Sequence, residues 1–127
     1  MNEQDQLMNF IEKIREEGTI VLVEGINDYK AMSSLGIEKI IMVKNKPLYK
    51  IVDQVVSEYR KAVILTDLDK EGKKLFSVLR HQLCQKGVII DNALRNFLFS
   101  STKIRQIEGL NSYLKKSQIF KEELLTI

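Results

Sequence analysis

The sequence contains few of the residues that form disulfides, zinc sites or rigid turns. Its 127 residues include one cysteine, one histidine and one proline. A single cysteine excludes an internal disulfide and a CxxC metal site, and a single histidine leaves no His/Cys ligand set for zinc. No apolar run approaches the roughly 20 residues that a membrane span requires. Neither of the phosphate-binding patterns GxxxxGKS/T and GxGxxG occurs, so neither common nucleotide-binding loop is supported.

Charge of neither sign dominates the composition. Lysine and arginine total 20, aspartate and glutamate total 17, and the formal net charge is +3. This balance permits nucleic-acid binding but does not require it. The polar, acidic N-terminus is unlike a signal peptide. We therefore expect a cytoplasmic protein that has no association with a membrane.

The lone cysteine and the lone histidine belong to one predicted helix. We interpret His81 as a residue of the helix surface or of the core edge, because no further His/Cys ligands accompany it. A Cys–His nucleophilic pair would need a cleft with an oxyanion site. We interpret Cys84 instead as a small buried residue.

Short apolar runs alternate with amphipathic helical patterns along the chain. The runs are rich in β-branched residues and end at polar residues or glycine, as buried parallel strands do. Predicted strands cover residues 19–23, 37–43, 62–65 and 88–90, with a candidate last strand at 104–107, and predicted helices cover 3–16, 28–35, 47–59, 70–86, 92–99 and 108–116. The alternation predicts a parallel sheet with right-handed crossovers.

A chain of this length can form one domain with a substantial core. Its hydrophobic content of 44% is typical of such a domain. We predict a single α/β domain over residues 1–127, with no internal repeat or linker. The core of the domain covers residues 18–116, a helix at 3–16 precedes it, and a tail at 117–127 follows it.

Acidic residues directly follow the first and third predicted strands. Glu24 follows the first, and Asp67 and Asp69 follow the third. Carboxyl ends of parallel strands meet at one edge of a sheet, where open α/β sheets build their sites. Side chains at i and i+2 point the same way, so both aspartates can reach one cation while Leu68 points back into the core. If the two strands are neighbours, Glu24 joins them in a magnesium site.

The negative charges of three crowded carboxylates repel one another, and this repulsion determines how the site should bind metal ions and protons. A divalent cation relieves the repulsion, and without it at least one pKa should rise. A protonatable Glu24 can then act as a general acid or base on a nucleotide oxygen. The metal would polarise the phosphate and organise the attacking or leaving oxygen.

Residues near the three acids have two interpretations each. Gly25 and Gly72 let the backbone approach closely or turn sharply. Asp28 and Glu71 are outer partners of the metal site or acids favoured in the first turn of a helix, and for Asp28 we favour the helix role slightly. Five lysines are candidates for holding phosphate or are solvated helix surface, namely Lys44, Lys46, Lys70, Lys73 and Lys74.

The two acidic motifs together resemble the signature motifs of Toprim domains. That family is shared by topoisomerases, bacterial-type primases, OLD-family nucleases, RecR recombination proteins and the maturation nuclease of 5S ribosomal RNA. The resemblance covers about residues 18–116 and rests on Val23-Glu24-Gly25-Ile26-Asn27-Asp28 and Thr66-Asp67-Leu68-Asp69-Lys70-Glu71-Gly72. Stand-alone small Toprim, primase-like proteins are the most similar in length. Asn27 departs from the pattern, since many members carry a basic or acidic residue there.

The resemblance implies a compact three-layer α/β sandwich around a mainly parallel sheet of about four strands. It maps a general acid or base onto Glu24 and magnesium ligands onto Asp67 and Asp69, and the positions of Asp28 and Gly72 also match. We do not expect topoisomerase activity. That activity needs a tyrosine on a further domain and a gate for DNA passage, and 127 residues cannot hold these in addition to the Toprim unit.

The resulting expectation is an enzyme that performs Mg²⁺-dependent chemistry on nucleic-acid phosphodiesters, with Mn²⁺ as an alternative ion. A nuclease is favoured, with RNA processing ahead of DNA. One alternative is a primase-like nucleotidyltransferase component in DNA replication or repair. Another is a non-catalytic nucleic-acid-binding module. A protein partner would supply further substrate-binding surface. The choice between DNA and RNA, the number of metals and the oligomeric state stay open at this point.

Overall fold

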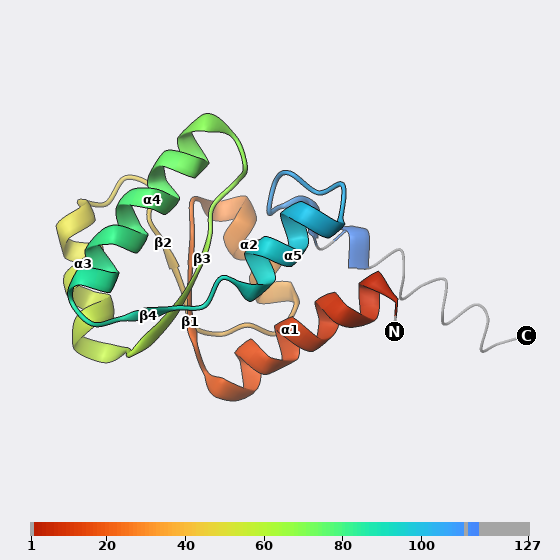
Figure 1. The fold of residues 1–127 in the computed structure, drawn as a ribbon, viewed down its shortest axis with the longest axis horizontal. Coiled ribbons are helices and arrows are strands. Elements are labelled where there is room, and N and C mark those ends of the chain that lie inside the picture. The colour runs from red at the N-terminus through yellow and green to blue at the C-terminus, as the bar shows by residue number, and fades with distance from the viewer. Residues whose placement is uncertain (1, 111, 115–127) are drawn as a thin grey trace, which may run out of the picture.

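A computed structural model describes residues 2–110 and 112–114, in which five helices surround a four-stranded sheet (Figure 1). The elements run in the order α1 (Glu3–Glu17), β1 (Ile20–Val23), α2 (Ile26–Ser34), β2 (Ile40–Met42), α3 (Leu48–Glu58), β3 (Lys61–Leu65), α4 (Lys70–Gln85), β4 (Ile89–Ile90) and α5 (Ala93–Ser101). The strand order is β2-β1-β3-β4, and every pair is parallel. The predicted parallel α/β fold is confirmed.

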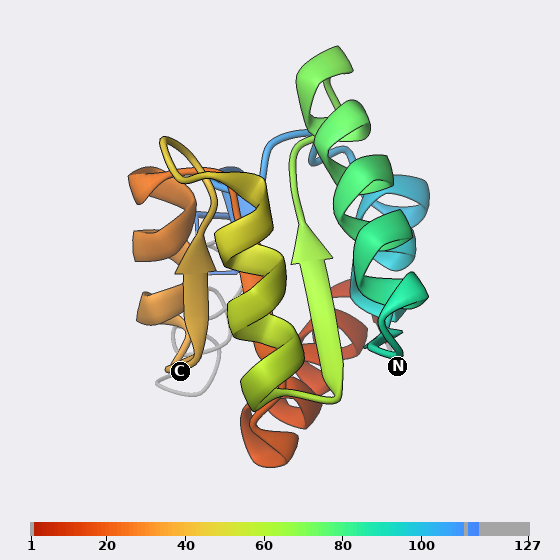
Figure 2. The same cartoon turned by 90° about the vertical axis from the view of Figure 1, so that its left-hand side faces the viewer.

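Helices cover both faces of the sheet. In Figure 2, α3 lies in front of the strands and α1 lies behind them. Side chains of the central strands β1 and β3 alternate between two apolar cores. The core shared with α1, α2 and α5 contains Val21, Val23, Val63 and Leu65. The core shared with α3 and α4 contains Ile20, Leu22, Ala62 and Ile64. These strands are apolar without interruption because they are buried on both sides. The three-layer sandwich is therefore confirmed.

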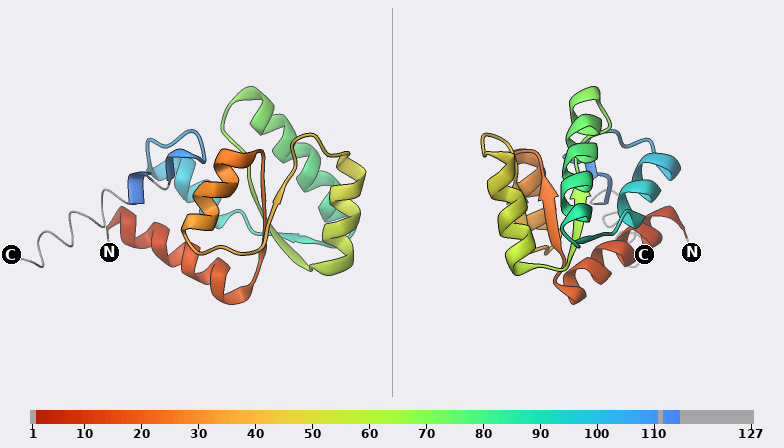
Figure 3. Two further views of the ribbon diagram at one scale, coloured as in Figure 1. Left: turned by 180° about the vertical axis from the view of Figure 1, so that it is seen from behind. Right: turned by 60° about the vertical axis from the view of Figure 1, so that its left-hand side comes forward.

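The first helix begins and ends where its sequence directs. The Asn2 side chain accepts a hydrogen bond of 2.8 Å from the Asp5 N–H and caps the N-terminus of α1. Gly18 ends the helix with φ 63°, a left-handed conformation that glycine adopts readily. α1 lies beside α5 (Figure 3), where the rings of Phe10 and Phe97 are 5.4 Å apart between centroids.

Two strand predictions need correction. β2 begins at Ile40 rather than at residue 37, because the Ile37 N–H closes the end of α2 by donating to the Met32 carbonyl at 3.3 Å. Residues 104–107 form no strand. They form an irregular segment after α5 whose backbone contacts the loop that follows β3.

The lone cysteine and histidine both lie on the outer surface of α4. His81 is exposed, as one of its two predicted positions required. Cys84 is also exposed, so its predicted burial is wrong. The reason is helical geometry, since Leu83 already occupies the inner face and the next residue turns by about 100° towards solvent.

Within residues 2–110 and 112–114, no helix is both long enough and apolar enough to cross a membrane. Residues 109–110 and 112–114 have helical backbone, in agreement with the start of the predicted helix at 108–116. The end of that helix and the predicted tail at 117–127 lie outside the described residues.

Candidate active site at the carboxyl edge of the sheet

Glu24 and Asp67 are adjacent at the carboxyl edge of the sheet because their strands are neighbours. β1 and β3 pair in parallel, with Val23 opposite Leu65. Each acid follows its strand within two residues, so both emerge at the same edge. Their contact is direct, since the Asp67 N–H donates a hydrogen bond of 2.8 Å to Glu24 Oε1. The first and third strands are neighbours, which is the condition on which the predicted proximity of Glu24 to the aspartates depended.

A segment from the C-terminal part of the chain crosses this edge and contacts Asp67. The Ile107 N–H donates a hydrogen bond of 2.8 Å to Asp67 Oδ1. Next to it, the Leu68 N–H donates to the Arg105 carbonyl at 3.1 Å. The side chain of Ile107 is fully buried, so it anchors the segment in the core. The segment that was predicted as a strand therefore fixes one oxygen of Asp67.

Asp69 has a structural role at the start of α4. Its Oδ1 accepts a hydrogen bond of 2.7 Å from the Gly72 N–H, which makes Asp69 the N-cap of the helix. Leu68 does not point into the core as predicted. It is half-buried and belongs to neither core cluster. Asp69 and Leu68 line a small hollow beside Arg105, separate from the cleft described below.

The three predicted metal ligands share one edge without forming a preassembled cage. Glu24, Asp67 and Asp69 each have one carboxylate oxygen bonded to a backbone N–H. Their second oxygens make no hydrogen bond or ion pair with any residue that the structure describes. Among the described residues, no three His, Cys, Asp or Glu side chains are positioned to hold a metal ion.

The acids at this edge are electrostatically coupled. Burial raises the pKa of Glu24, and the negative charges of Asp67, Asp69 and Glu71 raise it further, although the hydrogen bond from the Asp67 N–H lowers it. The coupling shows that the motifs lie near enough to influence one another's protonation. A cation placed among them would lower the pKa of Glu24 by relieving the repulsion.

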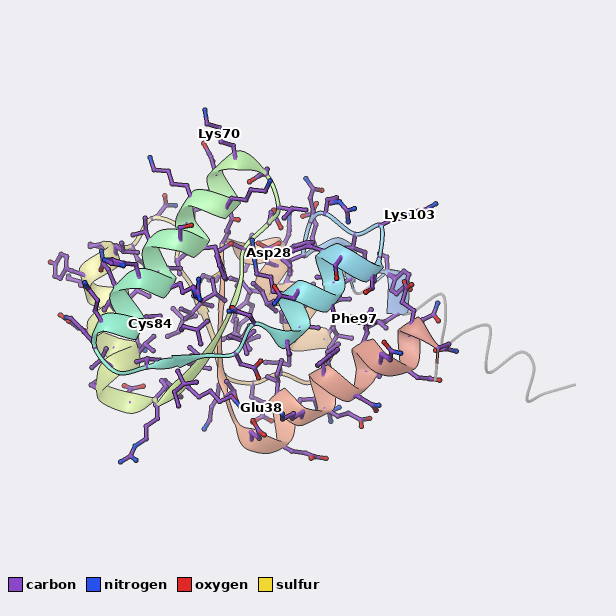
Figure 4. All side chains as sticks on the ribbon, in the orientation of Figure 1. Asp28, Glu38, Lys70, Cys84, Phe97 and Lys103 are labelled. Carbon is purple, nitrogen blue, oxygen red and sulfur yellow. The ribbon has the colours of Figure 1, made fainter. Side chains whose placement is uncertain are left out.

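Asp28 has the helix role that the sequence favoured, and it also lies close to the acids of the sheet edge. It lies in the first turn of α2, where its Oδ2 accepts a hydrogen bond of 3.3 Å from the Gly25 N–H. Its carboxyl group is buried, which raises its pKa to about 6, and the charges of Asp67, Glu24 and Glu108 also raise it. Asp28, labelled in Figure 4, therefore closes the start of a helix, and it lines the same cleft as Glu24 and Asp67.

The two glycines of the motifs differ in what requires them. A Cβ at Gly72 would lie 2.1 Å from the carbonyl oxygen of Asp67, so only glycine fits there. The Thr66 hydroxyl donates to the Gly72 carbonyl at 2.7 Å and holds the same close approach. At Gly25 a Cβ would meet only Lys44 Cδ at 3.9 Å, an ordinary contact. Close approach is thus confirmed for Gly72 and is wrong for Gly25.

Arg95 of α5 is a site residue that the sequence analysis missed. Its buried guanidinium donates to the carbonyl and, at 3.2 Å, to the hydroxyl of Thr66, and at 3.4 Å to the carbonyl of Asp67. The rings of Phe76 and Phe99 flank it, with centroids 4.4 and 4.9 Å from Cζ. Burial lowers its pKa, whereas the carboxylates of Asp67 and Glu24 raise it. A charged residue within the otherwise apolar stripe of a predicted helix was the available signal.

A cleft of about 1070 Å³ opens at this edge, between the β2–α3 loop and the first turns of α4. Five carboxylates contribute to its lining, those of Glu24, Asp28, Asp67, Glu71 and Glu108. Glu71 therefore belongs to the acidic edge as well as to the first turn of a helix. An anion would enter such a cleft only together with a cation or with basic side chains.

Proteins of related sequence match most of the chain. The UPF0292 protein of Methanocaldococcus jannaschii is 33% identical over 118 residues, which cover 88% of this chain and 92% of that protein. The chain belongs to the UPF0292 family. The name UPF0292 states no activity, so membership leaves the chemistry to the site itself. No protein-family model matches the chain.

A solved structure of a protein from Aquifex aeolicus shares the fold of this UPF0292 chain. The TM-score is 0.74 at 31% sequence identity, over 82% of this chain and 94% of that one. The link to the zinc-binding and RNA polymerase domains of the Aquifex aeolicus primase is weak, with a TM-score of 0.49 at 26% identity over 63% of this chain and 20% of that one. The first comparison supports the α/β architecture described above.

The five lysines predicted to bind nucleic acid fall into two groups in this UPF0292 structure. Lys44 and Lys46, on the β2–α3 loop, and Lys74, on α4, line the cleft. Lys70 and Lys73 do not line it, and Lys70 projects from the start of α4 into solvent (Figure 4). Helical spacing explains the division, because Lys74 shares the face of α4 that carries Glu71, Leu75 and Val78 at i, i+3, i+4 and i+7, and the other two lysines lie off this stripe.

Proposed function

We propose that this protein catalyses Mg²⁺-dependent phosphodiester chemistry on nucleic acid, and that its reaction is hydrolysis. The observation that carries the proposal is the direct contact between Glu24 and Asp67 at the ends of the two central strands, within a cleft that lysines line. The resemblance of both acidic motifs to Toprim domains supports the same conclusion. It favours a nuclease that processes RNA over one that acts on DNA.

The donor atoms at this edge suit a small divalent cation. Glu24, Asp67 and Asp69 offer carboxylate oxygens, the ligand type that Mg²⁺ and Mn²⁺ prefer. Mg²⁺ keeps several waters and uses one or two protein carboxylates together with substrate phosphates, so it needs no preassembled cage. When bound, the ion would polarise the scissile phosphate and orient the attacking oxygen.

The protein's own groups would divide the remaining work. The raised pKa of Glu24 brings its proton exchange closer to working pH, which suits a general acid or base. The Asp67 N–H holds Glu24 Oε1, which would leave Oε2 for a phosphate or water oxygen. Lys44, Lys46 and Lys74 would hold phosphates at the cleft. A protein partner that adds substrate-binding surface is part of the same proposal.

A specific observation favours one rival function. All three predicted ligands already accept hydrogen bonds from backbone N–H groups, as residues with purely structural roles do. The rival is a non-catalytic module that binds nucleic acid through its lysines. Calorimetry with Mn²⁺ separates the two, because the module would bind no ion at millimolar concentration.

The decisive experiment is cleavage of structured RNA and of DNA in the presence of Mg²⁺ or Mn²⁺. Glu24→Gln and Asp67→Asn should each lower the rate by about 100-fold or more. Glu38→Gln is the matched control, because Glu38 is exposed and lies outside the acidic cleft (Figure 4). Wild-type activity that survives both site substitutions would end the proposal.

A further inference from the structure

We propose that the cleft beside the carboxylates is a subsite for one unpaired nucleotide, with its phosphate on the lysines and its base against an aliphatic wall. The inference rests on the proposed function and narrows the substrate to nucleic acid that presents a single-stranded segment or end. A cleft of about 1070 Å³ is comparable to small-ligand sites of roughly 300–1,000 Å³. A duplex would instead require a broad, continuous contact surface.

The backbone of the β2–α3 loop fixes the position of two cleft lysines. Asn45 has φ 64°, which turns the chain sharply between Lys44 and Lys46. The Lys44 N–H donates to the Glu24 carbonyl at 2.9 Å, and the Lys46 N–H donates to the Val43 carbonyl at 3.3 Å. The first bond ties the loop to the residue that follows β1, and the second closes the turn within the loop, so the lysines stay next to the acidic edge.

The lysines of the cleft have no ion-pair partner among the described residues. The ion pairs among the described residues involve Lys61 and Lys86, and neither of these lysines lines the cleft. Lys44, Lys46 and Lys74 make none, although five carboxylates line the same cleft. Their ammonium groups are thus available to a ligand that carries negative charge, as a phosphate does.

An aliphatic wall lines another part of the same cleft. Leu48 at the start of α3 and Leu75 and Val78 on α4 form it, and all three are only partly buried. Figure 2 shows that α4 extends beyond α3 at this edge, so the first turns of α4 are not covered by the neighbouring helix. Covering this exposed apolar surface with the flat ring of a base removes it from water, which would stabilise the bound ligand.

The order of these groups matches the order of groups in a nucleotide. The phosphate would lie between the lysines and the acidic edge, where the carboxylates make its binding depend on a divalent ion. The base would lie on the wall of α3 and α4. Recognition through the base face tolerates different sequences but requires an unstacked base, which a duplex does not offer.

The test is calorimetry of AMP and of ribose 5-phosphate with the intact protein in Mg²⁺. AMP should bind at least about tenfold more tightly than ribose 5-phosphate, a difference of about 1.4 kcal/mol. The double substitution Lys44→Gln and Lys46→Gln should weaken both ligands by about tenfold. Lys50→Gln is the matched control, since Lys50 is exposed on α3 but does not line the cleft, and it should leave both affinities unchanged.

A substitution in the wall separates base recognition from phosphate recognition. Leu75→Ala should lower the affinity for AMP to that for ribose 5-phosphate, and binding of ribose 5-phosphate serves as the control for folding. Equal binding of AMP and ribose 5-phosphate by the wild-type protein would overturn the inference, as would equal losses in Lys44→Gln/Lys46→Gln and Lys50→Gln.

The subsite and the proposed function can fail separately. Binding of AMP with the expected discrimination, but without cleavage of any nucleic acid, would support the subsite and contradict the nuclease. Cleavage that depends on Glu24 and Asp67, but without discrimination between AMP and ribose 5-phosphate, would support the nuclease and contradict the subsite.

Discussion

At the scale of one residue, the burial of Asp28 at the acidic edge lowers the free energy of unfolding when its carboxyl group is ionised. Its exposed fraction is 7%, and burial raises its pKa from 3.8 to about 6. The folded state therefore binds the proton more tightly than the unfolded chain does, so ionisation of Asp28 destabilises the fold. The penalty is absent below about pH 4, grows as the pH rises through about 6, and is constant above that.

Asp28→Asn should raise the free energy of unfolding by about 2 kcal/mol near neutral pH. The amide oxygen of Asn can still accept the hydrogen bond from the Gly25 N–H, so the start of α2 is retained. Urea unfolding over a pH series measures the effect, and the gain should disappear as the pH falls below about 4. A gain that is the same at every pH would contradict the assigned titration.

The Arg95 guanidinium donates hydrogen bonds to the backbone carbonyls of Thr66 and Asp67, and its removal takes this donor away from both. Arg95→Met should lower the free energy of unfolding by about 3 kcal/mol. Arg95→Lys should lie between Met and wild type, because a single ammonium group cannot reproduce the fork that reaches Thr66 and Asp67. Urea unfolding measures both. Arg80→Met, on the exposed face of α4, is the control and should change stability by less than about 0.5 kcal/mol.

At the scale of the element, the start of α4 serves both folding and the proposed chemistry. Asp69→Ala should lose the N-cap and about 1 kcal/mol of stability, whereas Asp69→Asn should keep both. Metal-dependent cleavage should fall in both variants, because an amide is a poor substitute for a carboxylate ligand. Thermal unfolding and the cleavage assay are measured on the same samples. Full activity in stable Asp69→Asn would remove Asp69 from the metal site.

The first turn of α4 tolerates no side chain at its glycine, Gly72. Gly72→Ala should lower the free energy of unfolding by about 3 kcal/mol or more, because its Cβ would lie 2.1 Å from the Asp67 carbonyl oxygen. Gly109→Ala is the control, since nothing lies within 4 Å of a Cβ there, and its stability should stay near that of the wild type. Equal stabilities of the two variants in urea would show that the turn can open without cost.

The elements that the sequence predicted well are those decided by local pattern. β1 and β3 are apolar without interruption because helices cover both of their faces, and α4 shows its inner stripe at Leu79 and Leu83. The sequence also indicated the close backbone approach at Gly72, although the N-cap at Asp69 went unrecognised. Local pattern thus sufficed for the fold and for the two acidic motifs.

What the sequence did not predict depends on contacts between distant residues. The hydrogen bond from Ile107 to Asp67 joins positions 40 apart, and those from Arg95 to Thr66 join positions 29 apart. No periodicity encodes such pairs, because each depends on how α5 and the segment after it lie against the sheet. The segment at 104–107 has the composition of a strand but lacks a neighbouring strand with which to pair.

The whole molecule consists of two apolar cores that share one sheet. Because β1 and β3 contribute to both, loss of either core should unfold the entire structure. Leu98→Ala on α5 and Leu79→Ala on α4 should each lower the free energy of unfolding by about 3 kcal/mol. Circular dichroism and tyrosine fluorescence should give coincident single transitions in urea. Separate transitions in either variant would show that the two faces fold independently.

The segment at residues 104–107, which contacts Asp67, determines when the acidic edge can complete its hydrogen bonds during protein synthesis. A ribosome adds Glu24 and Asp67 long before Ile107, whose N–H holds Asp67 Oδ1. A nascent chain that stops short of this residue therefore carries both acidic motifs but lacks the hydrogen bond that holds Asp67 Oδ1. Translation must proceed about 40 codons beyond the DxD motif before the centre acquires its final shape.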